Sequence, residues 1–456
     1  MNARTTALEE LAQWCAALSW RAIPEAQREL VPLRVLDTLG LIAAGAGTEA
    51  ARAAAGMARD QGGAGTASLL AGFASTPASV PAALAALVHG VAAHCRDFDD
   101  TFADSVVHPG SVIVPVALAA GEAAGAAPDD IGAAIVAGYE VAARIGAVAG
   151  RRFHARGLHA TGVVGPIAAA ATAARASGLA AAETASAIGL AASMSGGLMA
   201  FQADGAWSKW LHAGWAAQGG IVAAQLAARG FRGPRTALDG PGNLFAAMLA
   251  GETCDLGMLT RDLGTAWRGA GAQFKYYPCA HVIQPYIDAA LSLRRAHGLA
   301  PDDIEAVRCP IAPWAVPIVC LPREAKIAPA SELDAIASLS YMVAYAIAEG
   351  RVTLDALSDA ARSREDLRAL AARIVHEEDA ALGRGFDARV EIRMRGGAVH
   401  TAAADAAVLD AGRLIAKFIA NTEPLLGAVR AREAATRLAA MKAPDPNSIA
   451  AILSPA

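Results

Sequence analysis

The sequence is short of charge, and its cysteines are not arranged in pairs. Only 18% of the 456 residues are charged and the net charge is -4, so nothing suggests nucleic acid or an anionic membrane as a partner. The six cysteines stand far apart, without a C-x-x-C pair, which argues against a zinc site or an iron–sulfur cluster. We therefore expect reduced, mostly buried thiols.

Several sequence signatures are also missing. There is no G-x-S-x-G, H-E-x-x-H, P-loop or G-x-G-x-x-G motif, so acyl transfer and nucleotide cofactors lack direct support. The segment 1–4 has no apolar core of a signal peptide. Two long uncharged runs, residues 184–203 and 210–228, are interrupted by glycine pairs and contain few large apolar residues. They predict buried core helices in a soluble, cytoplasmic protein.

Alanine-rich helical segments dominate what is present. Hydrophobic residues make up 55% of the chain, and small side chains allow helices to approach closely. Helices are predicted over residues 80–94, 128–150, 163–177, 181–194 and 209–228. After about Gly264 the character changes, with alternating strands predicted at 304–311, 388–394 and 398–402. A helix over 422–441 returns to the first style, so the fold is predicted to be mainly α with a smaller α/β part.

One polar stretch interrupts this apolar sequence. It runs from His94 to Thr101 and is followed by His108-Pro109. Carboxylates beside apolar helices must be solvated, paired, or lining a polar pocket. A pocket suits acid–base chemistry, whereas a surface loop with a capping aspartate is the plain structural alternative.

Further polar residues lie at loops or helix starts within apolar sequence. They are Gly157 to Gly162, Ser208 to Gly214, Lys275 with His281, and Ser338 to Tyr341. Lysines, histidines and a tyrosine suit a substrate with several carboxylates, because they hold negative charge and move protons. Each also has a structural interpretation: Lys209 as a solvated charge, His159 and His212 as structural histidines, Tyr341 as a core tyrosine and Thr101 as a turn cap.

The ordered set of motifs resembles the MmgE/PrpD family. It comprises D-F-D-D-T, H-P, G-x-H-x-T-G, K-x-L-H-x-G, K-x-x-P with a following histidine, and a late S-x-x-Y-type segment. The resemblance implies an all-helical domain formed by residues 1–268 and 403–456. It also implies an α/β lid inserted at 269–402, an active site in the cleft between them, a homodimer, and no metal or organic cofactor.

The resemblance also implies the site residues. It suggests His108, Asp97, His159 and Tyr341 as catalytic residues, and Thr101, Lys209, Lys275 and His281 as substrate-binding residues. His108 is our preferred acid or base, and Asp97 would orient it or act as a second base. Many relatives have arginine where this chain has Trp210, and serine where it has Gly110.

The implied chemistry is formation of a carbanion next to a carboxylate of a small di- or tricarboxylate. A dehydratase similar to 2-methylcitrate dehydratase is the first expectation. Alternatives are a cis-aconitate-type decarboxylase, an iminodisuccinate-type epimerase, or a non-catalytic binding protein on the same fold.

Overall fold

The chain forms two compact units in the computed structural model, which describes residues 5–453 apart from 64, 71, 74–77, 384 and 406–408. The first unit contains Met1–Cys95, Asp99–Ala272 and Ala411–Ala456. The second contains Arg96–Phe98 and Gln273–Asp410. Helices predominate among the described residues, which confirms the mainly α prediction.

The first unit is helical. Its helices in the first half of the chain are α1 (Ala7–Ala17), α2 (Glu25–Arg28), α3 (Leu30–Ala46), α4 (Glu49–Gly62), α5 (Ala82–His94), α6 (Gly110–Ala124), α7 (Pro128–Ala149), α8 (Arg152–Ala155), α9 (Ala160–Ala176), α10 (Ala181–Ser193) and α11 (Ser208–Ala227). They are joined by α12 (Leu244–Met248), α20 (Ala411–Leu426), α21 (Ala428–Ala439) and α22 (Pro446–Leu453). Short strands β1 (Ala67–Leu69) and β2 (Ala78–Val80) pair antiparallel, and β3 is Thr101–Phe102.

The core of this unit is built from α5, α7, α9 and α11. Helix α11 packs against α5 and α9, and α9 packs against α7. Every residue of α5 is buried, so its alanines and glycine permit close helix contact. At Gly220 of α11, an added Cβ would lie 2.2 Å from the Cβ of Ala169. Small residues are therefore a packing requirement here.

Helix α7 is the one described helix that is long and apolar enough to cross a membrane. A bent pair, Glu25–Ala46 with Glu49–Gly62, also passes this test of length and composition. However, 94% of the apolar window of α7 is buried inside the unit. Of the two runs that we expected to be core helices, 210–228 falls almost entirely in α11, whereas only the first half of 184–203 is in α10, which ends at Ser193.

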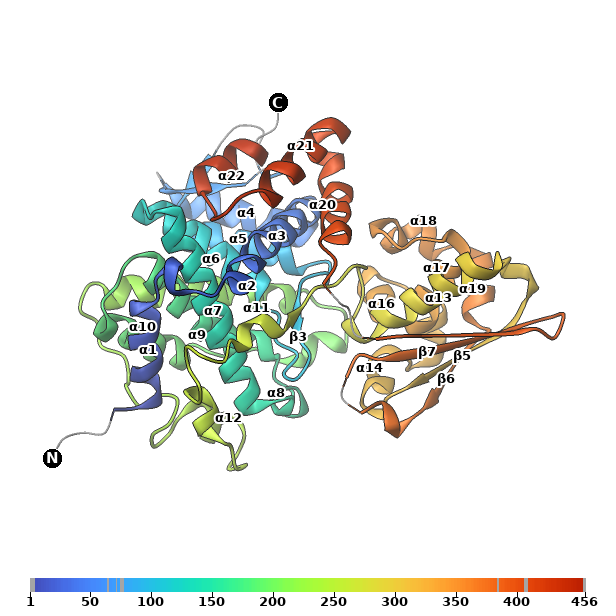
Figure 1. Cartoon of the computed structure of the whole chain (residues 1–456), viewed down its shortest axis with the longest axis horizontal. Helices are drawn as coiled ribbons and strands as arrows, with labels where there is room; N and C mark the ends of the chain where they lie inside the picture. Colours follow the sequence, from blue (N-terminus) through green and yellow to red (C-terminus); the bar gives the residue numbers. More distant parts are fainter. Residues whose placement is uncertain are drawn as a thin grey trace. The chain divides into compact units, whose positions relative to one another are not determined.

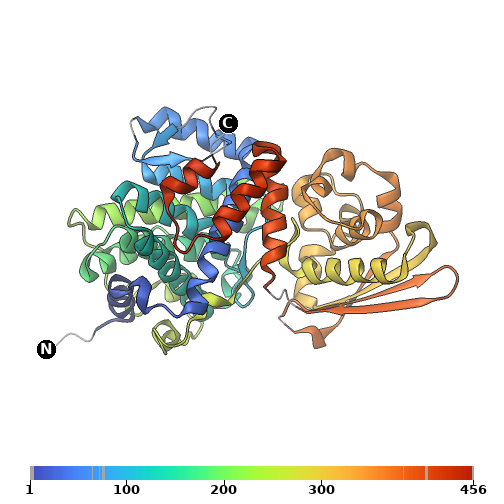
Figure 2. The ribbon, with the colours of Figure 1, turned by 45° about the horizontal axis from the view of Figure 1, so that its top comes forward.

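The C-terminal helices belong to the first unit, as the sequence predicts. Helix α20 packs along α3, and both views show the red helix beside the blue one (Figure 1 and Figure 2). The predicted single helix over 422–441 is wrong in its bounds. Two helices occupy this region, because Gly427 has a φ of 78° and interrupts the helix between α20 and α21.

The second unit contains a four-stranded sheet of order β6–β5–β7–β8. Its strands are β5 (Ile304–Ile311), β6 (Ile374–Glu378), β7 (Ala388–Met394) and β8 (Val399–Ala404). Strand β6 pairs parallel to β5, and the other pairs are antiparallel. A further short strand, β4 (Ala272–Gln273), spans the boundary between the units.

The helices of this unit are short except for two. They are α13 (Gln284–His297), α14 (Val316–Val319), α15 (Arg323–Ile327), α16 (Glu332–Ile336), α17 (Leu339–Glu349), α18 (Asp359–Arg362) and α19 (Glu365–Ala371). Helix α13 packs against β7, β8 and α17. The predicted strands 304–311 and 388–394 are confirmed, whereas β6 was not predicted.

Candidate active site

The polar stretch begins where α5 ends. His94 is the last residue of this buried helix, and Asp97 has a φ of 48°, a left-handed conformation that aspartate tolerates better than most residues. The three carboxylates that follow α5 have different partners. Asp97 pairs with Lys275, Asp99 with histidines, and Asp100 with Tyr139. Neighbouring acids in the sequence therefore have separate roles.

Asp99 lies between two histidines. Its Oδ2 accepts a hydrogen bond from His94 Nδ1 at 2.8 Å, and its Oδ1 is 3.4 Å from His108 Nδ1. The Asp99 side chain is only 1% exposed. Burial by itself raises the pKa of Asp99, but the charges of His94 and His108 outweigh this effect and hold the pKa well below its ordinary value. Asp99 is therefore ionised and acts only as an acceptor.

His108 has a second polar neighbour. Thr101 Oγ1 is 3.1 Å from His108 Nδ1, the same ring nitrogen that faces Asp99. The backbone N–H of His108 donates to Thr161 Oγ1 at 3.1 Å. Two of the predicted site residues, Thr101 and His108, are thus in direct contact, and the loop that carries His108 is held by α9.

Other imidazole rings lie around this pair. The His94 ring stacks on His159 with centroids 5.6 Å apart, and it meets His108 edge-on at 4.9 Å. His159 Nδ1 is 3.1 Å from His212 Nδ1, so one of these two nitrogens donates and the other accepts. Burial, followed by nearby positive charge, lowers the pKa of His159 well below its usual value. The same causes lower the pKa of His212 to about 4 and that of His154 to about 4.

Lys209 adds a positive charge to this group. It follows the first residue of α11 and is 9% exposed, so the predicted position at a helix start is confirmed. Lys209 and His212 are three residues apart on one helix and share a face. The charge of Lys209 contributes to the lowered pKa values of His154, His159 and His212. An anionic group would be attracted to this neighbourhood.

The adjacent Asp100 belongs to a different cluster. Its Oδ1 accepts from the Gly110 N–H at 2.8 Å and its Oδ2 from the Tyr139 hydroxyl at 2.7 Å. Arg34 lies 3.7 Å above the Tyr139 ring. Burial raises the pKa of Asp100 to about 7, against the opposing effects of Tyr139 and Arg34. A Cβ on Gly110 would come within 2.6 Å of Asp100 Oδ1, so any side chain here would require the carboxylate to move.

In the second unit, Lys275 holds Asp97. Its Nζ donates to both the backbone oxygen and Oδ1 of Asp97, each at 2.7 Å, and the lysine is 1% exposed. Within the second unit Asp97 is therefore paired with a lysine, and within the first unit Asp99 is a carboxylate that lies beside His108.

The remaining two predicted residues have other neighbours within the second unit. His281 stacks on Phe386 with ring centroids 4.4 Å apart. Tyr341 is fully buried, and its hydroxyl donates to the Ala356 carbonyl at 2.7 Å. Burial raises the pKa of Tyr341. In the first unit, Thr101, His108, His159 and Lys209 form one neighbourhood, while Lys275 and Asp97 form a pair in the second.

Sequence reasoning did not assign roles to Asp99 and His94. Both lie in the polar stretch that the sequence singled out, but motif matching transfers Asp97 and Thr101 and passes over the aspartate between them. The sequence signal that could have indicated their pairing is the position of Asp99 five residues after His94, just beyond the end of a predicted helix.

His94, Asp99 and His108 are also donor types that bind divalent cations. Their ligand atoms lie within 4.8 Å of one another, and all three residues are buried. The 2.8 Å distance between His94 Nδ1 and Asp99 Oδ2 is that of a direct hydrogen bond. Because these two atoms are hydrogen-bonded to each other, we interpret the cluster as a hydrogen-bonded network and not as a cation site.

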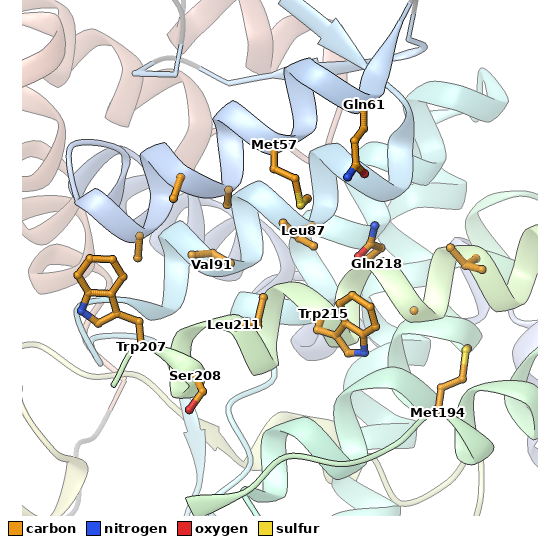
Figure 3. A pocket seen from close by; sticks show the side chains of 15 residues that line it. Met57, Gln61, Leu87, Val91, Met194, Trp207, Ser208, Leu211, Trp215 and Gln218 are labelled. Atoms are coloured by element: carbon orange, nitrogen blue, oxygen red, sulfur yellow. The ribbon is translucent and has the colours of Figure 1, made fainter. Parts of the chain in front are cut away.

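A separate apolar cavity of about 1080 Å³ lies on the opposite side of α11 from its buried residues. Figure 3 shows Leu211 and Trp215 of α11, with Trp207 just before this helix, on the same pocket as Met57 of α4 and Leu87 of α5. Trp215 is 57% exposed and Trp207 is 46% exposed. No residue that lines this cavity carries a charged side chain.

Comparison with known proteins identifies the chain. Residues 9–256 match the MmgE/PrpD N-terminal domain, and residues 277–441 match the MmgE/PrpD C-terminal domain. The chain belongs to the MmgE/PrpD family. The family's C-terminal domain extends beyond the second compact unit, because α20 and α21 lie within the match but pack in the first unit.

The similar curated proteins are named cis-aconitate decarboxylase or cis-aconitate decarboxylase-like protein. Human cis-aconitate decarboxylase is 29% identical over 311 residues, which cover 65% of this chain and 61% of that protein. The mouse protein of the same name is 28% identical over 345 residues, covering 72% and 67%. The cis-aconitate decarboxylase-like protein oryM of Aspergillus oryzae is 29% identical over 239 residues, or 49% of each chain. The chain thus spans about half to two thirds of the length of these relatives.

Proposed function

We propose that the protein is a lyase that acts on a small di- or tricarboxylate through a carbanion formed next to a carboxylate. The observation that carries this proposal is the buried group of His108, Thr101 and Asp99 beside Lys209. A histidine supplies or removes the proton, and a lysine attracts the carboxylate and the developing negative charge. Membership of the MmgE/PrpD family adds support for lyase chemistry.

Within this class, decarboxylation is our first proposal. Sequence reasoning placed 2-methylcitrate dehydration first, but the similar curated relatives are named for cis-aconitate decarboxylation. In a decarboxylation, the bond to the leaving carboxylate breaks, carbon dioxide departs, and the electron pair stays on the substrate. An acid then gives a proton to that carbon or to its conjugated position. One proton donor suffices for this reaction, whereas a dehydratase needs both a base that removes the carbon-bound proton and an acid that protonates the leaving hydroxyl.

We assign roles to the remaining residues on the basis of the resemblance. Lys209 and Lys275 would bind substrate carboxylates, with His159 and His281 as further donors. Thr101 and Tyr341 would position the substrate or relay a proton. Asp97 would hold Lys275 in place, since the two are 2.7 Å apart, and it would also orient His108 or act as a second base. No step needs a metal or an organic cofactor, and the role of the second unit as a lid stays part of the proposal.

Proton NMR in deuterated water tests this function. The purified chain is incubated separately with cis-aconitate, 2-methylcitrate and iminodisuccinate. We expect cis-aconitate to lose a carboxylate and the product to carry deuterium from solvent. His108→Ala is the matched variant and should lose roughly 10²- to 10⁴-fold in turnover. Product from 2-methylcitrate alone would favour the dehydratase, and a folded protein silent on all three acids would contradict the proposal.

We also propose that the protein is a cytoplasmic homodimer, with the apolar cavity as part of the contact between two copies. An uncharged face suits a self-complementary contact, because no like charges meet across the twofold axis. Large exposed apolar side chains such as Trp215 are typical of interaction sites.

Light scattering coupled to size exclusion tests this contact. Trp215→Asp should convert a dimer into a monomer, whereas Val429→Asp on α21, equally apolar and 65% exposed, should leave the dimer intact. A monomeric wild type would refute the idea.

A further inference from the structure

We infer that Asp99 is a positioning residue that fixes the ring of His108 through Nδ1, so that Nε2 is the nitrogen left to exchange a proton with substrate. This inference rests on the proposed function for the chemistry of His108. The geometry itself is independent of it. Asp99 lies 3.4 Å from His108 and 2.8 Å from His94, so each carboxylate oxygen faces a different imidazole.

The tautomer of His108 follows from its two neighbours. Asp99 is an ionised acceptor, and Thr101 Oγ1 lies 3.1 Å from the same nitrogen. If Nδ1 had no hydrogen, its lone pair would face the carboxylate, and the two would repel each other. With a hydrogen on Nδ1, Thr101 Oγ1 accepts it at 3.1 Å, and the positive end of the N–H also lies 3.4 Å from the Asp99 carboxylate. Neutral His108 is therefore the Nδ1–H form, and its Nε2 points away from Asp99.

His94 fixes the carboxylate in turn. It is fully buried at the end of α5 and holds Oδ2 of Asp99. With one oxygen held by His94, the other stays directed at His108. The series His94–Asp99–His108 therefore determines both the orientation of the His108 ring and which of its nitrogens bears the proton. Carboxylates next to other catalytic histidines act in the same way.

Asp99 also supplies a negative charge to this neighbourhood. Titratable groups near His108 include His94 from α5, His154 from α8 and His159 before α9, and Lys209 from α11 acts on His154 and His159. Lys209 and any protonated histidine disfavour a positive charge on His108. Asp99 opposes them from 3.4 Å away, so its charge favours the protonated form of His108.

The test combines NMR of labelled histidines with kinetics on the full chain. In wild type, nitrogen-15 spectra, assigned with a His108→Gln variant, should show His108 as the Nδ1–H tautomer. In Asp99→Asn, the midpoint of His108 titration should fall by about one unit or more. If an acid is turned over, kcat should drop roughly 10²- to 10⁴-fold with KM within about threefold, and the pH profile should move with the midpoint.

Asp104→Asn is the matched control, because it removes an exposed carboxylate from the same segment. It should leave the midpoint and the turnover unchanged. An Nε2–H tautomer in wild type would overturn the inference even if Asp99→Asn does not fold. An unchanged midpoint in Asp99→Asn, or an equal shift in Asp104→Asn, would also overturn it. The NMR measurement needs no substrate, so inactivity towards all three acids would refute the proposed function and leave the Asp99 inference to be decided separately.

Discussion

Two buried polar clusters of the helical unit begin at neighbouring residues, Asp99 and Asp100, and they differ in how completely their polar groups are paired. Both oxygens of Asp100 accept hydrogen bonds, from Gly110 and Tyr139. Arg34, beside Tyr139, donates to the Gly269 carbonyl at 2.6 Å. In the Asp99 cluster, by contrast, no described residue bonds to His94 Nε2.

The electrostatics of the two carboxylates differ in the same way. Burial dominates at Asp100 and raises its pKa to about 7, whereas two histidines hold the pKa of Asp99 well below its ordinary value. A fully paired network stabilises one conformation. A network with titratable rings and spare hydrogen-bonding capacity is what proton transfer needs. The comparison thus separates a structural cluster from a chemical one within two consecutive residues.

The largest expected effect is on the structural cluster. Asp100→Ala leaves the Tyr139 hydroxyl and the Gly110 N–H buried without their acceptor. Each orphaned group costs about 1 to 3 kcal/mol, so we expect a loss of roughly 2 to 6 kcal/mol in the free energy of unfolding. Urea titration followed by circular dichroism measures it. Asp104→Ala, at an exposed position, is the control, and a loss below about 1 kcal/mol would remove the distinction between the clusters.

The dependence of stability on pH should have opposite signs in the two clusters. His154 and His212 have folded-state pKa values of about 4, below the unfolded value of about 6.5. Their contribution is therefore present above about pH 6.5 and is lost as the pH falls towards about 4. Asp100 has a raised pKa of about 7, so its contribution is present at low pH and is lost as the pH rises from about 4 to about 7.

Asp100→Asn and His154→Gln separate these contributions. Urea unfolding at several pH values between about 4 and 7.5 should show that Asp100→Asn removes the decrease in the free energy of unfolding as the pH rises. This decrease is on the order of a few kcal/mol. His154→Gln should reduce the decrease in the free energy of unfolding as the pH falls. If both variants keep the wild-type slope, the two groups do not titrate as their burial implies.

The sequence predicts the elements well and the pairing of the acids poorly. Pro128 with two following aspartates marks the start of α7, and alternation marks β5 and β7. Strand β6 ends in Glu377 and Glu378 and lies at the sheet edge, where pairing with β5 and not its own pattern makes it a strand.

The polar stretch was visible because charge interrupts apolar sequence, but its pairings depend on distant residues. Lys275 and Tyr139 select Asp97 and Asp100. The left-handed turn at Asp97, which separates the acids, has no sequence signature of its own. Motif resemblance points to Asp97, and the contacts of His108 within the first unit add Asp99.

The smallest expected effect on stability comes from Tyr341. Its substitution tests whether the Tyr341 hydroxyl serves only the fold or also the substrate. Its hydroxyl donates to the Ala356 carbonyl, as in a paired structural group, yet the family resemblance places it in the site. Tyr341→Phe should cost about 1 kcal/mol of stability through the lost hydrogen bond. If Tyr341 also positions substrate, kcat/KM should fall by roughly tenfold or more, which exceeds what this loss causes in a protein that is still folded. Tyr345→Phe, four residues and about one helical turn further along α17, controls for removal of a neighbouring hydroxyl. Unchanged kcat/KM in Tyr341→Phe would assign Tyr341 to the scaffold, because its hydroxyl would then serve Ala356 alone.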